Sequence, residues 1–333
     1  MQISERAKAL QHEAFVFDAL AAIGQSREIV SRLLEAGYDA LNLTVSAHGE
    51  TLEIALQKMA IFYWFRDAAA DLVRVVTSAA DLDDVHRGKL RIIVGFQGAE
   101  PIQQNFHHIS IFHALGVRLV QLTYNEQNRL GYGCLEPDDR GLTHFGIQSV
   151  REFNRLGMVV DVSHAGYRTS LDAVNVSSDP VIASHSNPRS LRDNPRNITD
   201  EQMKAIAERG GVIGIASFAD FVADTRQGQP TLAQYIDHIA YAVNMVGVEH
   251  VGIGTDAMDA RGSAGIWWNA NTKRKYPEQC GAMDDKMHGI TGFESWYDFP
   301  SLTDGLLQRG FSDDDTRKII GGNFLRVMRA VLR

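Results

Sequence analysis

Two histidines and one aspartate stand at the ends of apolar runs in this sequence, and they carry its clearest chemical signal. His164 ends the run MVVDVSH, His185 lies near the end of PVIASHS, and Asp256 ends HVGIGTD. Neutral imidazoles bind divalent metal ions, and a nearby carboxylate can orient or deprotonate a bound water. A single histidine in such a place is more often a hydrogen-bonded structural residue. The three residues together favour a metal site over that structural explanation.

Polar residues also end two earlier apolar runs. Gln97 ends LRIIVGFQ, Tyr124 ends VRLVQLTY, and Glu126 follows two residues later. The Tyr124 hydroxyl could donate a hydrogen bond to a substrate carbonyl oxygen, and Glu126 could act as an acid, a base or a further ligand. For Glu126 we favour the simpler alternative, in which its carboxylate satisfies the backbone of its own loop.

Three arginines follow His185 on the proline-containing segment SHSNPRSLRDNPRN, namely Arg189, Arg192 and Arg196. Guanidinium groups bind carboxylates through paired hydrogen bonds, so one of the three could hold an acidic substrate group. Solvated surface charge explains any single one of them at least equally well. The segment alone therefore does not choose among the three.

These residues need a scaffold that brings the ends of strands together. Eight short apolar runs alternate with helical patterns, which predicts parallel strands that are each followed by a helix. The runs are nearly continuous in hydrophobicity, as expected for strands buried on both faces in a closed (β/α)₈ barrel, whose active site lies at the carboxyl ends of the strands. The predicted strands are 15–20, 39–45, 90–97, 117–124, 158–164, 180–186, 211–218 and 250–256.

The segments between the runs have helical periodicity and recognisable ends. SREIVSRLLEAG, GIQSVREFNRLG and DEQMKAIAERGG each end in a glycine suited to the position after a helix. Thr199 and Gln202 form a capping box, which predicts where the third of these helices begins.

Segment 258–299 interrupts this alternation. It is rich in glycine and aromatic residues and has no clear period, which predicts a long loop or lid over the barrel mouth. Residues 301–333 are predicted to form a C-terminal helical segment with two helices joined near a glycine pair. One large barrel can account for all 333 residues, so we expect a single domain over 1–333.

The composition limits the partners and the compartment. A formal net charge of −8 leaves no basic surplus for phosphates, so nucleic acid is not an expected partner. No run approaches the roughly 18 apolar residues of a membrane span, and the first residues lack the apolar core of a signal peptide. The two cysteines, Cys134 and Cys280, form no CxxC pair, which argues against a disulfide framework and against a cysteine-rich zinc site. We therefore expect a cytoplasmic protein.

Five motifs, in the same order along the chain, resemble the membrane (renal) dipeptidase family, peptidase family M19. They are DVSHAG (161–166), ASHSNPRSL (183–191), RNITDEQMKAIAERGGVIGI (196–215), HVGIGTD (250–256) and KIIGGNFLRV (318–327). The resemblance implies a (β/α)₈ TIM barrel of the metallo-dependent amidohydrolase type, zinc-dependent hydrolysis of dipeptides and a homodimer. It also implies that His164 and His185 bind one metal, that Asp256 handles protons, and that Arg196 holds the substrate carboxylate.

The chain departs from this family where the family binds its other metal. The family's first strand ends in Asp-Gly-His-x-Asp, whereas residues 18–22 read Asp-Ala-Leu-Ala-Ala, and leucine and alanine cannot ligate. The family's metal-bridging acid aligns with Gln97, whose neutral amide is a poor bridge between cations. The family's carbonyl-polarising histidine aligns with Tyr124. We therefore expect one zinc ion per chain, held by His164 and His185 and completed by Gln97, Asp256 or water, with Gln97 as the candidate third ligand.

Three functional hypotheses follow. The first is a mononuclear zinc hydrolase that cleaves an amide bond in a small, carboxylate-bearing, dipeptide-like substrate. In it Asp256 carries protons, Arg196 binds the carboxylate and Tyr124 stabilises the oxyanion. The second keeps this site but performs lactone or imine hydrolysis or a lyase reaction on a small acid. The third is a catalytically inactive, metal-free binding protein, and the joint presence of His164, His185, Asp256 and Arg196 speaks against it.

Overall fold

The structure is a computed structural model that describes residues 3–21, 23–47, 49–83, 88–256 and 289–333. Its strands are β1 (Phe17–Ala21), β2 (Ala40–Ser46), β3 (Val73–Val75), β4 (Leu90–Gln97), β5 (Val117–Gln121), β6 (Val159–Asp161), β7 (Ile213–Ile215) and β8 (Val251–Ile253). Its α-helices are α1 (Glu5–Glu13), α2 (Arg27–Glu35), α3 (Leu52–Ala68), α4 (Phe106–Ala114), α5 (His144–Leu156), α6 (Tyr167–Val176), α7 (Asp200–Glu208), α8 (Ala219–Val222), α9 (Leu232–Val246), α12 (Phe299–Arg309), α13 (Asp313–Arg317) and α14 (Asn323–Val331).

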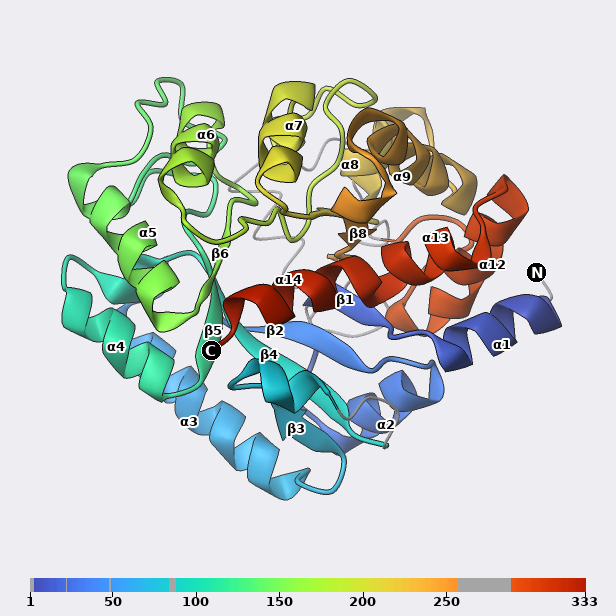
Figure 1. The fold of residues 1–333 in the computed structure, drawn as a ribbon, viewed down its shortest axis with the longest axis horizontal. Helices are drawn as coiled ribbons and strands as arrows, with labels where there is room; N and C mark the ends of the chain where they lie inside the picture. The colour runs from blue at the N-terminus through green and yellow to red at the C-terminus, as the bar shows by residue number, and fades with distance from the viewer. Residues whose placement is uncertain (1–2, 22, 48, 84–87, 257–288) are drawn as a thin grey trace.

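The strands form the predicted parallel ring, with helices outside it (Figure 1). One sheet runs β1-β2-β4-β5-β6, and β7 pairs with β8. Two parallel bridges, Asp161 to Ile182 and Ala183 to Ile213, join β6 to β7 through residues 182–183. The backbone N–H of Asp256 donates to the carbonyl of Leu20 at 3.1 Å, which connects the chain after β8 to β1. The expected (β/α)₈ barrel is thereby confirmed.

The prediction of a continuous strand over 180–186 is wrong, because this segment makes only isolated bridges. The backbone N–H of Ser184 donates to the Asp161 carboxylate at 2.9 Å, and that of His185 donates to Ser163 Oγ at 3.0 Å. These two amides therefore bind side chains rather than carbonyls of a neighbouring strand. The sequence analysis also missed β3, a three-residue strand that pairs with the first half of β4.

The predicted helix ends are confirmed. Thr199 and Gln202 form both bonds of the capping box at the start of α7. Gly37, Gly157 and Gly210, just after α2, α5 and α7, have positive φ angles of 87°, 71° and 77°, which glycine adopts without steric cost.

The barrel interior changes from apolar to polar along the strands. Near the amino ends, a buried cluster contains Ala40, Leu119, Val159, Ile182, Val212 and Phe324 of α14, the helix that lies across this end of the barrel (Figure 1). A Cβ on Gly252 would lie 2.4 Å from the Phe324 ring, so the packing there requires glycine. Two residues further along four of these strand segments stand the buried Asn42, Gln121, Asp161 and Ser184. Because side-chain direction alternates along a strand, they share the inward face.

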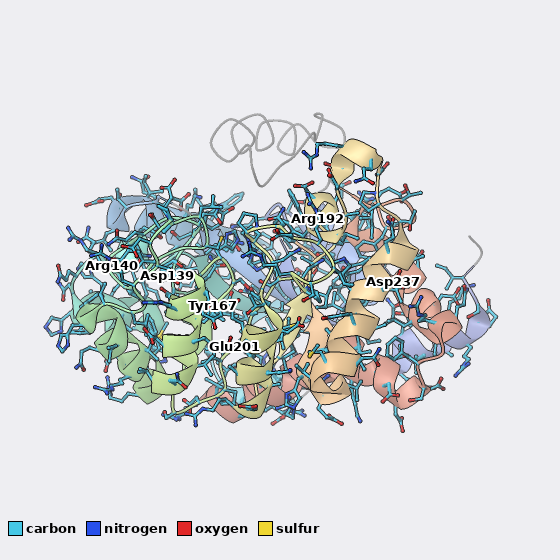
Figure 2. The ribbon with its side chains drawn as sticks, turned by 90° about the horizontal axis from the view of Figure 1, so that it is seen from above. Asp139, Arg140, Tyr167, Arg192, Glu201 and Asp237 are labelled. Carbon is cyan, nitrogen blue, oxygen red and sulfur yellow. The ribbon has the colours of Figure 1, made fainter. Side chains whose placement is uncertain are left out.

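The loop between β5 and α5 is held by side-chain hydrogen bonds. Asp139 accepts from the backbone N–H groups of Arg168 and Thr169 and so caps the first turn of α6. Tyr167, at the start of α6, donates to Glu201 of α7 beside it (Figure 2). Gly133 forms a bridge with Ala165, which fixes the loop to the residues that follow His164. This loop is therefore part of the ordered rim of the barrel.

Most of the predicted lid, residues 257–288, lies outside the described residues. Residues 289–298 pack onto the body, where Ile290, Phe293 and Trp296 are buried. The C-terminal segment contains α12, followed by α13, a π-helical turn at Lys318–Gly322 and α14. Within the described parts of the chain, no helix combines the length and the apolar character needed to cross a bilayer.

A buried carboxyl group clamps the first strand to the last. Asp18 accepts hydrogen bonds from the N–H and the hydroxyl of Thr255, at 2.8 and 2.6 Å, and from the N–H of Leu20 at 3.1 Å. Burial raises its pKa from 3.8 to about 7 despite these bonds, and the nearby negative charge of Asp256 adds to the rise.

We expect Asp18→Asn to remove part of the pH dependence of stability. The native Asp18 carboxyl keeps its proton up to about pH 7, whereas the ordinary value is 3.8. In this window the unfolded chain binds fewer protons, so Asp18 makes the free energy of unfolding fall as pH rises, by up to about 1.4 kcal/mol per pH unit. Urea unfolding across the window would measure the slope, with the exposed Asp138→Asn as control. An unchanged slope in Asp18→Asn would contradict the assignment.

Candidate metal-binding active site

The two histidines predicted as metal ligands face one another at the carboxyl ends of adjacent barrel segments. His164 Nε2 lies 2.9 Å from His185 Nε2. His164 is 5% exposed and His185 is fully buried. His164 follows β6 with a left-handed φ of 62°, a costly conformation for a residue with a side chain. The local backbone is thus shaped to turn this imidazole toward its neighbour.

The other ring nitrogens indicate which tautomers are present. His164 Nδ1 lies 2.6 Å from Asn125 Oδ1, an acceptor, so this nitrogen donates. His185 Nδ1 lies 2.7 Å from Ser184 Oγ, whose own hydrogen goes to Asp161 at 2.5 Å, so this nitrogen donates as well. In a neutral ring the second nitrogen then carries a lone pair. Two lone pairs therefore converge at 2.9 Å, and either a shared proton or a bound cation between them would relieve their repulsion.

A divalent cation fits this arrangement. Two imidazole nitrogens bound to one tetrahedral zinc lie roughly 3.3 Å apart, close to the 2.9 Å between His164 Nε2 and His185 Nε2. The Gln97 amide, at the end of β4, lies 3.4 Å from His185 Nε2. Its nitrogen and oxygen are assigned from the hydrogen-bond network, so the reversed amide would present oxygen to a cation. The described residues contain no cluster of three or more His, Cys, Asp and Glu suited to a metal, and among them this amide is a candidate third ligand.

The family resemblance places ligands of the other metal at the end of β1. In the described part of that strand, no side chain is available as a metal ligand. Leu20 is fully buried, and Asp18 is engaged with Thr255. Residue 22 lies outside the described residues. Cys134 is also unsuited as a ligand, because burial raises the pKa of its thiol to about 11 and it donates to Asn125 Oδ1. Among the described residues, these positions therefore offer no side-chain donor for a second cation.

Tyr124 lies directly against the histidine pair. Its ring stacks on that of His164 with the centroids 3.9 Å apart and the planes inclined by 23°. Glu126 makes a tight turn with it, since the Glu126 N–H donates to the Tyr124 carbonyl at 2.7 Å. Tyr124 is therefore at the site, whereas this bond places Glu126 in the turn that shapes the loop.

Of the three candidate arginines, the structure brings Arg196 to the site. Its side chain is 1% exposed, and its Nη2 donates to the carbonyl of His185 at 3.0 Å. Its Nε and Nη1 are buried without a hydrogen-bond partner among the described residues, and such donors suit a carboxylate ligand. Arg189 instead pairs with Asp193 at the surface, and Arg192, labelled in Figure 2, binds the buried Asp220.

Asp256 completes the set of predicted residues. Like Asn125 and His164 it has a positive φ, here 49°, so three residues around the site adopt left-handed conformations. Loss of hydration raises the pKa of Asp256 to about 7, and the positive charge of Arg196 partly opposes the rise. Burial also lowers the pKa of His185 well below its ordinary value, with Arg196 contributing. The site thus favours a neutral imidazole and a carboxyl group able to exchange protons near neutrality.

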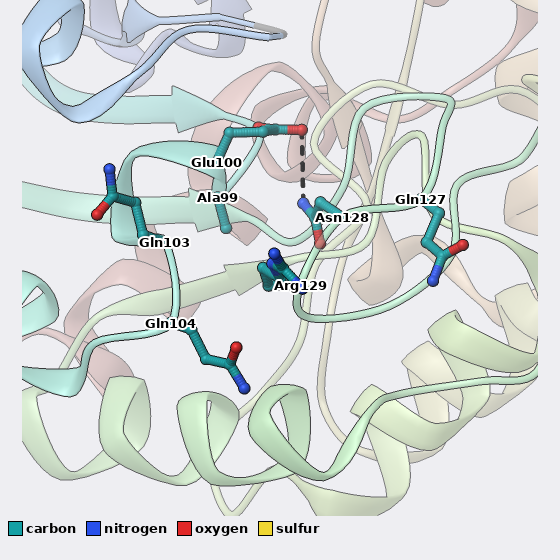
Figure 3. Close-up of a pocket in the computed structure, with 7 residues that line it drawn as sticks. All are labelled: Ala99, Glu100, Gln103, Gln104, Gln127, Asn128 and Arg129. Carbon is teal, nitrogen blue, oxygen red and sulfur yellow. Dashed lines mark hydrogen bonds between the residues drawn. The ribbon is translucent and has the colours of Figure 1, made fainter.

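An open pocket of about 670 Å³ lies between the segments that follow β4 and β5 (Figure 3). It is lined by Ala99, Glu100, Gln103, Gln104, Gln127, Asn128 and Arg129. Glu100 and Asn128 stand three residues after Gln97 and Asn125, and their side chains are 3.5 Å apart. The same two segments therefore shape both the histidine site and this polar pocket.

Three residues that hold the histidines were not predicted from the sequence: Asn125, Asp161 and Ser184. Each stands next to or three residues before a predicted site residue. The inward alternation of β6 could have indicated Asp161, because Val159 precedes it by two residues on the same face. Nothing in the sequence indicates that Asn125 Oδ1 and Ser184 Oγ contact the imidazoles.

Comparisons with known proteins agree with this architecture. A solved amidohydrolase from Pseudomonas aeruginosa superposes with a TM-score of 0.88 at 33% identity, covering 98% of this chain and 99% of its own. A Klebsiella pneumoniae protein described as uncharacterized, in the pqqA 5′ region, is 34% identical over 86% of this chain and 99% of its length. Dipeptidase tcpJ of Claviceps purpurea is 28% identical over 86% of this chain.

The chain spans 62% of the length of that Claviceps dipeptidase. The sequence model of the membrane dipeptidase family, peptidase family M19, matches residues 16–269 and 280–333. These ranges include every residue of the histidine site described above. The chain therefore belongs to the membrane dipeptidase family, peptidase family M19.

Proposed function

We propose that the protein is a metal-dependent hydrolase that cleaves the amide bond of a small, dipeptide-like substrate with one zinc ion per chain. The observation that carries this proposal is the convergence of His164 Nε2 and His185 Nε2 while both Nδ1 atoms are engaged. Membership of the dipeptidase family and the similarity to named dipeptidases support the choice of an amide bond.

His164, His185 and Gln97 would hold the ion. Bound zinc supplies a water of lowered pKa and polarises a carbonyl group. His164 and His185 keep the orientation needed for this because Asn125 and Ser184 bind their Nδ1 atoms. Leucine at position 20 supports one ion rather than two.

Arg196 would bind the carboxylate of the substrate. Two of its guanidinium nitrogens lack a hydrogen-bond partner among the described residues, and its third is fixed to the His185 carbonyl. The Phe221 ring, 5.1 Å from the guanidinium carbon, supports the side chain from one side. A carboxylate held here would place the neighbouring amide bond close to His185.

Asp256 would take the proton from the attacking water and deliver it to the leaving amine. A carboxyl group with a pKa of about 7 exchanges protons efficiently near neutral pH. Tyr124, stacked on His164, would donate its hydroxyl hydrogen to the developing oxyanion.

A second candidate function keeps these residues and changes the bond that is broken. Leu20, Gln97 and Tyr124 stand where the family resemblance expects metal ligands and a carbonyl-polarising histidine. This difference favours testing lactones, imines and small acids beside dipeptides. If neither metal nor turnover is found, a metal-free binding protein becomes the better description.

We further propose one domain over 1–333 with 301–333 as a C-terminal helical segment. The segment 258–299, predicted as a lid, lies mostly outside the described residues, and its described part, 289–298, packs onto the body. A homodimer is proposed from the family resemblance, and light scattering of the full chain would test it. A cytoplasmic location is proposed because the chain has two cysteines, of which Cys134 forms no disulfide.

We expect purified protein to contain about one zinc per chain. The double variant His164→Ala/His185→Ala should lose it, because both imidazole ligands are removed. His107→Ala/His144→Ala removes two exposed histidines and should keep it. Elemental analysis measures the content. An absence of metal in the wild type, even after incubation with zinc, would rule out the single-zinc hydrolase.

We expect the rate of hydrolysis at low substrate concentration to rise with pH up to a midpoint at or below about 7. Asp256 must be ionised to accept a proton. Its pKa is about 7 without a metal ion, and a bound cation would lower this pKa. Asp256→Asn should lower the rate by about 10²- to 10⁴-fold and abolish this dependence. Steady-state kinetics with dipeptides would measure both. Retention of the same pH profile in Asp256→Asn would assign the proton transfer to another group.

A further inference from the structure

We propose that Ser184 and Asp161 form a hydrogen-bonded relay that positions His185 as a metal ligand. This inference rests on the proposed metal-dependent function. The relay runs from His185 Nδ1 to Ser184 Oγ over 2.7 Å and from Ser184 Oγ to Asp161 Oδ2 over 2.5 Å. All three residues are fully buried.

The Ser184 hydroxyl makes both bonds through a single oxygen atom. The Ser184 hydroxyl has one hydrogen, which goes to the Asp161 carboxylate, and lone pairs that accept from the His185 N–H. The carboxylate therefore fixes the direction of the serine hydrogen, and the serine fixes the tautomer of His185. With Nδ1 protonated, the Nε2 lone pair of His185 points at His164 Nε2, 2.9 Å away.

Asp161 is a fully buried carboxyl group close to the site, and burial raises its pKa above the ordinary value. Among the described residues, its carboxylate accepts hydrogen bonds from Ser163 and Ser184, which are neutral donors. A buried charge without a cation is costly. A metal ion bound by His185 would lie at the far end of the relay and offset the cost of ionising this carboxyl group. The carboxylate, serine and histidine are thus arranged as a metal ligand and its outer support.

The same residues fix the backbone beneath the ligand. The Asp161 carboxylate also accepts from the Ser184 N–H at 2.9 Å, and Ser163 Oγ accepts from the His185 N–H at 3.0 Å. These bonds do not involve the Ser184 hydroxyl. Replacing Ser184 by alanine therefore removes the relay and leaves the backbone bonds in place.

The test compares Ser184→Ala with Ser184→Thr, which keeps the hydroxyl, and with Ser149→Ala. Ser149 is a buried serine of α5 whose hydroxyl has no partner among the described residues, so it controls for loss of a buried hydroxyl. Zinc affinity is measured by competition with a chromophoric chelator, and the absorption of bound Co²⁺ reports ligand geometry. Urea unfolding without metal reports stability separately from binding.

We expect Ser184→Ala to bind zinc about 10- to 100-fold more weakly and to change the Co²⁺ spectrum, while Ser184→Thr and Ser149→Ala stay near wild type. Should Ser184→Ala fail to fold, Asp161→Asn must show the weakened affinity. Zinc affinity within about threefold of wild type in the folded Ser184→Ala protein would overturn the relay. Wild type that binds no zinc would overturn the proposed function instead, so the two failures are distinguishable.

Discussion

The site depends on two imidazole lone pairs that face each other. His164 and His185 approach to 2.9 Å with both Nδ1 atoms engaged as donors. A protein gains nothing from holding two acceptors this close unless a positive group joins them, because lone pairs repel and neither nitrogen can be solvated in a buried site. Their burial, their side-chain partners and the left-handed backbone at His164 all serve this one contact. The case for a metal comes from this requirement rather than from a large set of acidic ligands.

The barrel makes the contact possible by dividing its interior into two parts. At the amino ends, apolar residues and the Phe324 ring fill the space tightly enough that Gly252 cannot carry a side chain. Two residues further along the strands the same inward face becomes polar, with Asn42, Gln121 and Asp161 buried. The apolar part supplies stability, so the polar part can hold groups that are costly to bury, such as the Asp161 carboxyl group.

The sequence predicted the ring of strands and the main site residues because both follow from the period of apolar residues and from where each run ends. It failed at 180–186, where the amides of Ser184 and His185 bind the side chains of Asp161 and Ser163. Hydropathy describes how buried a segment is, but it does not identify the acceptor of each backbone hydrogen. Ser184 was missed for the same reason, since the relay depends on the register between two segments that are distant in sequence.

The first strand shows how an apolar residue at position 20 is compatible with the fold. Asp18 remains, and it binds Thr255 through both the N–H and the hydroxyl, so it joins β1 to the segment that ends in Asp256. Leu20 donates its N–H to the Asp18 carboxyl and accepts from the N–H of Asp256 through its carbonyl. Both contacts use the Leu20 backbone, which any residue supplies equally. An apolar side chain at position 20 is therefore compatible with a closed barrel and with the position of Asp256.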